Sequence, residues 1–336
     1  MLPGDIDYMN GMVEVPHEED RKLERRDLFR GAGTVAAWLA AANQGAAVAA
    51  EIPDAVPPAA PGPPLPVVPF GKHRISRLIA GANTIYGYSH FNYLYSTHMG
   101  EYHTTPRVIS FLRELERAGY NTWQASWSER LETDWLKYKE QGGKLQLLLL
   151  SRPTFNDEPH MLQRAMKLKP LGIAQHGQQT NRLWHLGQFE KSLDYLKRIR
   201  DTGAMVGLSC HNPLAVEKAE EKGWDIDYFM NSLYYMNRPR EEFEKMLGGH
   251  VPLGEIYLPA DPPRMLETIR KVKKPCLVYK VLAAGRTVNS PQQVKERIAY
   301  ALKGIKPNDA IIIGIYQRFN DQIGQTAQFA REVLAS

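Results

Sequence analysis

GIAQHGQQTNRLWHLGQFEKSLDYLKRIRDTGAMVGLSCHN, residues 172–212 of the chain, places two short apolar runs on either side of a longer charged segment. The runs at 171–177 and 204–211 have the length and composition of strands that are buried on both faces. Residues 186–203 between them have the pattern of a helix that stops at Gly203. The stretch therefore predicts a strand, a helix and a second, parallel strand.

The same alternation extends over the rest of the chain. Six further strands are predicted at 77–83, 121–126, 144–151, 227–235, 275–283 and 309–317, with helices such as 106–119 and 290–305 between them. Eight strands, each followed by a helix, are typical of a (β/α)8 TIM barrel. An open doubly wound sheet would usually carry a G-x-G-x-x-G turn after its first strand, but the sequence there is GANTIYGYS. We therefore favour the barrel, with an α/β fold class.

The N-terminal 70 residues have a different composition and predict no part of the barrel. Arg25 and Arg26, followed by Leu-Phe-Arg and an alanine-rich run, resemble a twin-arginine export signal over residues 1–50, cleaved near Ala50. An amphipathic N-terminal helix is the alternative. Residues 51–70 are a Pro-rich linker, and 71–336 form the barrel. We expect a periplasmic or cell-envelope protein that meets the twin-arginine export machinery, with its N-terminal tail anchored or free.

Composition excludes several classes of protein. The 336 residues carry a net charge of +5 and a pI of about 9.0, but no Lys/Arg block, so a nucleic-acid partner is not expected. The two cysteines, Cys210 and Cys276, lie in separate apolar runs and are expected to be free buried thiols. No membrane span is expected in the mature chain.

Residues 83–104, directly after the first predicted strand, hold five tyrosines, three histidines and a phenylalanine. The stretch shows neither a helical stripe nor a strand alternation, so we predict a long irregular first βα loop. Such loops are usually lids or binding loops, although these rings could also simply pack on the barrel rim. Tyrosine faces and hydroxyls suit sugars and other polyols. If the loop were instead a protein interface, Tyr93 and Tyr95 would be its main contacts.

The ends of the predicted strands should carry the active site, because TIM barrels bind their ligands at that face. Polar and aromatic side chains in or after these ends are candidates for substrate binding: Asn83, Tyr86, His90, Gln124, Trp127, Arg152 and Tyr235. His176 and His211 close two neighbouring apolar strands, and Lys280 closes a third. We expect His176 to be the catalytic acid/base, supported by His211 and Lys280.

Three further groups could take part in the chemistry. His176 and His211 could bind a divalent metal if a carboxylate joined them, with Glu255 and Asp157 as loop candidates. Lys280, flanked by apolar residues, could act as a base or a Schiff-base nucleophile. Arg286, Tyr316 and Arg318 lie after the last two strands, where this fold usually binds phosphate, so they are candidates for a cofactor site.

Three segments, ISRLIAGANTIYG at 75–87, the stretch 173–213 and DAIIIGIYQRFNDQIGQTAQFAREVL at 309–334, resemble the aldo/keto reductases in sequence and order. The resemblance implies a TIM barrel that reduces carbonyls with NADPH through Asp, Tyr, Lys and His. His176 matches the family histidine. The other three positions differ, since Gln124 or Ser126, Trp127 or Ser128, and Ser151-Arg152 stand there.

We therefore expect an exported TIM-barrel enzyme with a rebuilt active site, acting on a small carbonyl or sugar-like substrate. Oxidoreduction and proton transfer both remain open, as do NADP(H) and a divalent metal as cofactors. The alternatives are a metal-dependent isomerase or lyase of the same fold, and a barrel that binds carbohydrate without catalysis.

Overall fold

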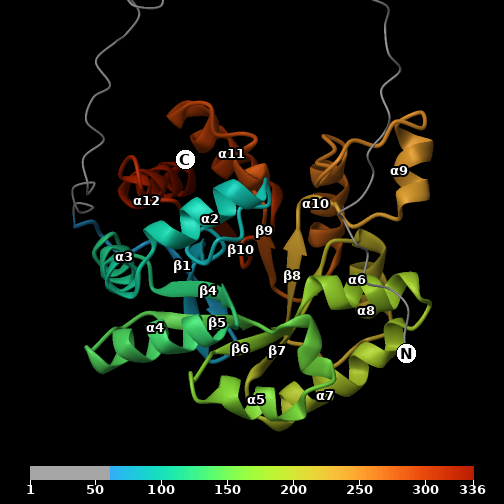
Figure 1. Cartoon of the computed structure of the whole chain (residues 1–336), viewed down its shortest axis with the longest axis horizontal. Helices are drawn as coiled ribbons and strands as arrows, with labels where there is room; N and C mark the ends of the chain where they lie inside the picture. The colour runs from blue at the N-terminus through green and yellow to red at the C-terminus, as the bar shows by residue number, and fades with distance from the viewer. Residues whose placement is uncertain (1–60) are drawn as a thin grey trace, which may run out of the picture. The chain divides into compact units, whose positions relative to one another are not determined.

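A computed structural model of the chain describes residues 61–336 and contains a closed barrel of eight parallel strands (Figure 1). The predicted signal peptide and the linker up to residue 60 lie outside the described residues. The barrel strands are β3 Leu78–Gly81, β4 Thr122–Ser126, β5 Gln146–Leu150, β6 Gly172–Gln175, β7 Met205–Cys210, β8 Tyr228–Ser232, β9 Cys276–Tyr279 and β10 Ala310–Gly314. All eight lie within the predicted strands, and β10 pairs with β3 to close the barrel. The TIM-barrel prediction is confirmed.

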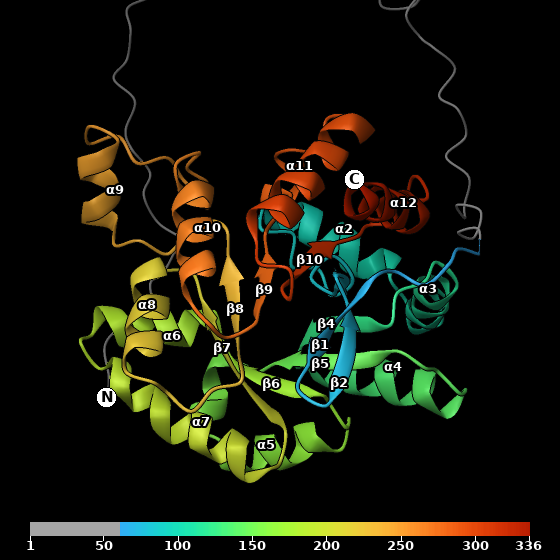
Figure 2. The same cartoon turned by 180° about the vertical axis from the view of Figure 1, so that it is seen from behind.

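Helices surround the barrel on its outer side, as the two opposite views in Figures 1 and 2 show. The helices of eight or more residues that follow the strands are α2 Tyr93–Tyr102, α3 Thr105–Arg117, α4 Glu129–Glu140, α5 Pro159–Met166, α6 Gly177–His185, α7 Ser192–Asp201, α8 Pro213–Glu221, α10 Asp261–Lys271, α11 Pro291–Gly304 and α12 Gln322–Ala335. Gly119 and Gly203, predicted as helix stops, have φ of 94° and 79°, a left-handed backbone that glycine adopts without strain.

A hairpin of β1 Val67–Phe70 and β2 His73–Ser76 precedes the barrel. Its side chains belong to the inner core: Val68, Phe70 and Ile75 cluster with residues of the barrel interior. The Phe70 and Tyr228 rings meet edge to face with centroids 4.9 Å apart. Tyr228 is the first residue of its strand, so the hairpin fills the N-terminal end and leaves the C-terminal end open to ligands. Four residues of the predicted linker thus belong to a strand.

The aromatic segment 83–104 is only partly irregular, which corrects the prediction of a loop throughout. Residues Tyr93–Tyr102 form helix α2, begun by Asn92, whose side-chain oxygen accepts a hydrogen bond from the Tyr95 amide at 2.8 Å. Only Met99 in this helix is buried. A helix without a buried stripe has no 3.6-residue hydrophobic period, which is why the sequence pattern missed it.

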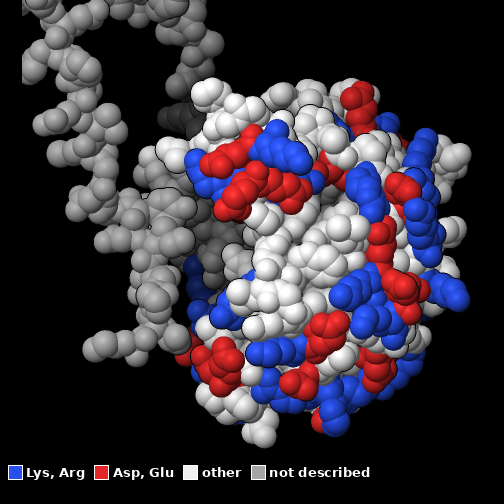
Figure 3. All heavy atoms as spheres, turned by 90° about the vertical axis from the view of Figure 1, so that its right-hand side faces the viewer, with Lys and Arg blue, Asp and Glu red and all other residues white. Residues whose placement is uncertain are grey.

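Charged side chains of both signs are mixed on the face that Figure 3 shows, without a large area of one sign. None of the helices formed by residues 61–336 is long and apolar enough to cross a membrane. Cys210 and Cys276 are free and buried, as expected.

Candidate active site

A cavity of about 460 Å³ opens at the C-terminal end of the barrel. It runs from the ends of β3 and β9 along β10 to the first turns of α11 and α12, with the segment before α2 and part of that helix on one side. Its volume lies in the range of small-molecule sites. Of the residues that line it, Lys280 is the only Lys, Arg, Asp or Glu.

Backbone strain is concentrated beside this cavity. Five non-glycine residues in the range 61–336 have positive φ, and four of them lie here: His90 at 55°, Lys280 at 61°, Ala283 at 49° and Ala284 at 50°. The fifth is Lys169, which precedes β6. Each such residue costs about 1–3 kcal/mol, a cost that folds usually retain only at functional sites.

The strain at Lys280 has a specific effect on side-chain direction. Successive side chains of a strand point to opposite faces, so Tyr279 and Lys280 should diverge. Because β9 ends at Tyr279 and the next residue turns into the left-handed region, both side chains line the cavity.

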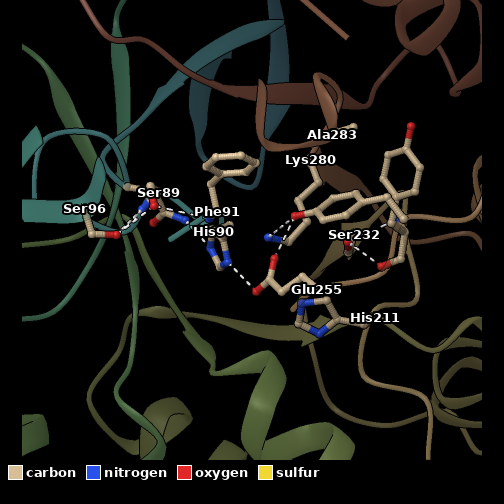
Figure 4. A network of polar contacts seen from close by, with 12 residues as sticks. Ser89, His90, Phe91, Ser96, His211, Ser232, Glu255, Lys280 and Ala283 are labelled. Carbon is tan, nitrogen blue, oxygen red and sulfur yellow. Dashed lines mark hydrogen bonds and ion pairs between the residues drawn. The ribbon is translucent and has the colours of Figure 1, made fainter. Parts of the chain in front are cut away.

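Glu255, in the long loop between α9 Arg240–Met246 and α10, organises the polar groups around Lys280 (Figure 4). Its Oε1 lies 2.6 Å from Nδ1 of His90, and its Oε2 accepts a hydrogen bond from the Tyr257 hydroxyl at 2.9 Å. Asn83 Nδ2 lies 3.1 Å from Nε2 of His90. These contacts assign the His90 proton to Nδ1 and leave Nε2 as an acceptor.

Arg286, in the loop after β9, contacts Tyr257 and the segment around His90. Its guanidinium lies 4.1 Å from the centre of the Tyr257 ring and 5.7 Å from that of Phe91. Its Nη1 also donates to the His90 carbonyl oxygen at 3.3 Å. Arg286 therefore joins the segment that precedes α2 to the loop that carries Glu255.

The surroundings lower the pKa of Lys280 and of Glu255 alike. Burial lowers the pKa of Lys280 to about 8, with the positive charge of Arg286 adding to the effect and Glu255 opposing it. Burial would raise the pKa of the Glu255 carboxyl, but the hydrogen bond from His90 and the charge of Lys280 outweigh it and hold that pKa below its usual value. Within the described part of the chain, Lys280 makes no ion pair, and its nearest polar partner is the Tyr257 hydroxyl at 3.5 Å.

Tyr279 connects the cavity to His211. The Tyr279 hydroxyl lies 3.1 Å from Nε2 of His211 and 3.2 Å from the Ser209 hydroxyl, and Nδ1 of His211 is 3.0 Å from the Asn181 amide. Burial, with the charge of Lys280, lowers the pKa of His211 well below its ordinary value. His211 is therefore a neutral ring with both nitrogens occupied, and it reaches the cavity only through Tyr279.

His176, expected to be the acid/base, lies at the N-cap of α6. Its Nδ1 accepts a hydrogen bond from the Gln178 amide at 3.2 Å and so caps α6. It does not line the cavity. Burial, with a smaller effect of His90, lowers the pKa of His176 to about 4. The strand-end position was right, but the helix that follows uses the ring.

Four predicted substrate-binding residues also lie outside the cavity, because neighbouring helices take up their side chains. Tyr86 donates to Asp134 of α4 at 3.3 Å, and Trp127 is buried against Phe155. Arg152 is exposed, 5.9 Å from the Trp127 ring. Tyr235 stacks between His185 and Arg238. The other three, Asn83, His90 and Gln124, do line the cavity.

Of the three residues predicted to bind a cofactor, one lines the cavity and two lie outside it. Tyr316 lines the cavity, its buried hydroxyl has no hydrogen-bond partner among residues 61–336, and burial raises its pKa to about 12. Arg286 is engaged with Tyr257, and the Arg318 guanidinium lies 4.6 Å from the Tyr102 ring. Neither arginine lines the cavity. Residues 61–336 contain no group of three His, Cys, Asp or Glu side chains arranged for a metal, so no carboxylate joins His176 and His211.

Sequence reasoning missed three members of the site. Tyr257 and Tyr279 were not singled out, and Glu255 was considered only as a metal ligand. Tyr279 precedes Lys280 on a predicted strand, so only the unusual backbone at Lys280 reveals that both face the cavity. Glu255 and Tyr257 lie in a long loop without hydrophobic period, which offers no pattern to read.

Comparison with known proteins finds only distant structural neighbours. No protein-family model matches the sequence, and none of the curated proteins compared with it is similar. A solved structure titled Gox0644 in its apo form is 11% identical, with a TM-score of 0.47 over 80% of this chain and 93% of that one. A thermostable aldo-keto reductase, Tm1743, solved with the inhibitor epalrestat, is 16% identical, with a TM-score of 0.40 over 81% and 95%. The barrel itself rests on the strand order.

The resemblance to aldo/keto reductases implies a nicotinamide dinucleotide, but the residues present do not fit one. Two linked phosphates need cations or free helix N-termini. Lys280 is the only cation of the lining, and Asp321, through its side-chain oxygen, already caps α12 at the other end. Of the two residues near the position of the family tyrosine, Trp127 is buried and Ser128 caps α4. We therefore derive no step through this cofactor.

Proposed function

We propose that the chain is an enzyme that moves a proton beside the carbonyl group of a small neutral compound, as an isomerase or lyase does. The observation that carries the proposal is the position of Lys280: it is the only charged side chain of the cavity lining, and a strained backbone directs it there. Strain and a lowered pKa together are typical of catalytic groups.

The neighbours of Lys280 supply what proton transfer requires. A carbonyl group beside Nζ lies within the cavity that Tyr279 also lines, so the Tyr279 hydroxyl donates to the oxygen, where negative charge develops. The Asn181 amide nitrogen donates to Nδ1 of His211, so Nε2 carries the ring proton and donates to the Tyr279 oxygen, which leaves the Tyr279 hydroxyl proton for the carbonyl oxygen. A base with a pKa near 8 exchanges protons readily at neutral pH.

The lining also favours a class of substrate. A cavity with one cation and no anion suits a neutral or singly negative compound. At the mouth, Tyr88 and Phe91 are 52% and 64% exposed, and Phe319 is 50% exposed from the other side. Tyr88 and Phe319 also line the cavity, so these rings flank an entering ligand. Such rings pack on the flat faces of a sugar or an aromatic group, which agrees with the sugar-like or carbonyl substrate expected from the sequence.

The test is exchange of hydrogen between substrate and solvent. The purified protein is incubated in D2O with neutral aldehydes, ketones and ketoses, and NMR follows loss of the proton on the carbon next to the carbonyl. We expect exchange above the uncatalysed rate for at least one compound, and its loss in Lys280→Met. A panel without any exchange would contradict the proposal.

Two earlier expectations enter as competing outcomes. A native mass spectrum of the protein purified without added ligands would show a nicotinamide dinucleotide if the chain were an oxidoreductase after all. A non-catalytic carbohydrate-binding barrel would bind sugars with the same affinity before and after Lys280→Met, because it has no turnover to lose.

We also propose that the protein is exported through the twin-arginine route to the periplasm or cell envelope. The support is the sequence of residues 1–50 alone. Replacing Arg25 and Arg26 by lysine should retain the full-length protein in the cytoplasm, whereas the unaltered chain should be recovered from the envelope fraction with a new N-terminus near residue 50. Unchanged fractionation would contradict this.

A further inference from the structure

Lys280 has the surroundings of a nucleophile as well as those of a base. Its amine has no carboxylate partner within the described residues, and it lies in a cavity open to small molecules. Burial lowers the pKa of this lysine to about 8, so a substantial fraction of it is the free amine near neutral pH. The free amine, unlike the ammonium, has a lone pair that can attack a carbonyl carbon.

We propose that Lys280 forms a covalent imine with an aldehyde or ketone in this cavity. This inference rests on the proposed function and names its covalent step. The Nζ lone pair forms a C–N bond to the carbonyl carbon, and the oxygen takes a proton to give a carbinolamine. The C–O bond then breaks, and the oxygen leaves with a second proton as water. Overall, a carbonyl compound and a lysine ammonium give a protonated imine and water.

The residues around Nζ match the proton movements of this sequence. The Tyr257 hydroxyl, 3.5 Å from Nζ, is hydrogen-bonded to Glu255 and so connects the amine to a carboxylate. Tyr279, on the same cavity wall, donates to the carbonyl oxygen that becomes the leaving hydroxyl.

His90 then has a defined task. The protonated imine withdraws electrons and makes the neighbouring C–H bond acidic. His90 lines the cavity, and to take the substrate proton its Nε2 exchanges the hydrogen bond from Asn83 for that proton, while Glu255 holds Nδ1–H and stabilises the imidazolium that forms. Lys280 therefore forms the imine, and the His90–Glu255 pair takes the proton from the neighbouring carbon.

The experiment traps the imine on the full-length protein. The chain is incubated with hydroxyacetone, a neutral ketone, in the presence of sodium cyanoborohydride, and the modified peptide is located by mass spectrometry. We expect one reduced adduct per chain, on Lys280, and its loss in Lys280→Arg. Lys273→Arg, at the exposed opposite end of β9, is the matched control and should keep the adduct.

The pH dependence gives a second measurement that does not depend on a variant folding. Because only the free amine attacks, the rate of adduct formation should rise with pH and level off above about 8. Labelling spread over surface lysines, without a preference for Lys280 and without this midpoint, would overturn the inference.

Hydrogen exchange with the same ketone separates the covalent step from the proposed function. Exchange together with an adduct on Lys280 supports both. Exchange without an adduct overturns the imine and leaves Lys280 as a simple base. An adduct without exchange supports the imine and overturns the proton transfer. If neither exchange nor an adduct is observed, both proposals are overturned for this ketone.

Discussion

His176 and His211, which follow β6 and β7 directly, do not line the cavity, whereas His90 and Lys280 line it from strained backbone. The first pair sits where a reader of the sequence would look, directly after apolar strands. The second pair depends on two loops with no regular pattern. The comparison teaches that a strand end brings a residue to the right face but does not decide whether its side chain is free.

The largest effect is expected from the free lysine. Lys280→Met keeps the length and the backbone strain but removes the amine, so solvent exchange should fall by about 10³-fold. NMR in D2O measures it, and Lys273→Met is the control for loss of a surface charge. An exchange rate within threefold of the unaltered protein would show that Lys280 is not needed for proton transfer and would contradict the contrast between the two pairs of residues.

A second pair of variants compares a residue beside the cavity with a residue outside it. Glu255→Gln keeps the shape but weakens the hold on His90, and should lower the exchange rate by about 10²-fold. His176→Asn should leave the rate unchanged, because asparagine is also a good helix cap. The comparison fails if the His176 variant is the slower of the two.

His176 and His211, which follow β6 and β7, should instead affect the stability of the fold at acid pH. Their pKa values are lowered by burial, to about 4 for His176 and in the same direction for His211. The unfolded chain therefore binds protons first, below pH about 6.5. Stability should be constant above that pH and fall by roughly 2–4 kcal/mol towards pH 4.5. Urea unfolding at both pH values measures this, and His211→Asn should reduce the difference.

The smallest effect has an unusual sign. Lys280→Gly removes a side chain from a left-handed position and a partly charged group from a buried one, so it should stabilise the fold by about 1 kcal/mol while abolishing exchange. Lys273→Gly, in an ordinary backbone, should destabilise it by a similar amount. Thermal unfolding of the two variants measures this difference. Melting temperatures that shift in the same direction would contradict the claim that the backbone at Lys280 is strained.

The sequence predicted the barrel well because its strands are short apolar runs that periodicity detects. It identified Asn83, His90, Gln124, Tyr316 and Lys280 as residues of the mouth, and all five line the cavity. It could not show that Gln178 engages His176, or that α4 takes Tyr86, since both follow from contacts between elements. Helix α2 escaped prediction because its exposed faces are as apolar as its buried one.

The attachment of His90 has a consequence for the size of the ligand. His90 belongs to the segment that leads into α2, and it is held by Glu255 from one loop and by Arg286 from another. Any movement of this segment that widens the mouth separates the imidazole from its carboxylate. In this structure the cavity is open while the pair is assembled, so a small carbonyl compound reaches Lys280 without breaking it. A compound too large for the existing opening would have to displace the segment and would thereby disable the base, so the same contacts that build the base also select for size.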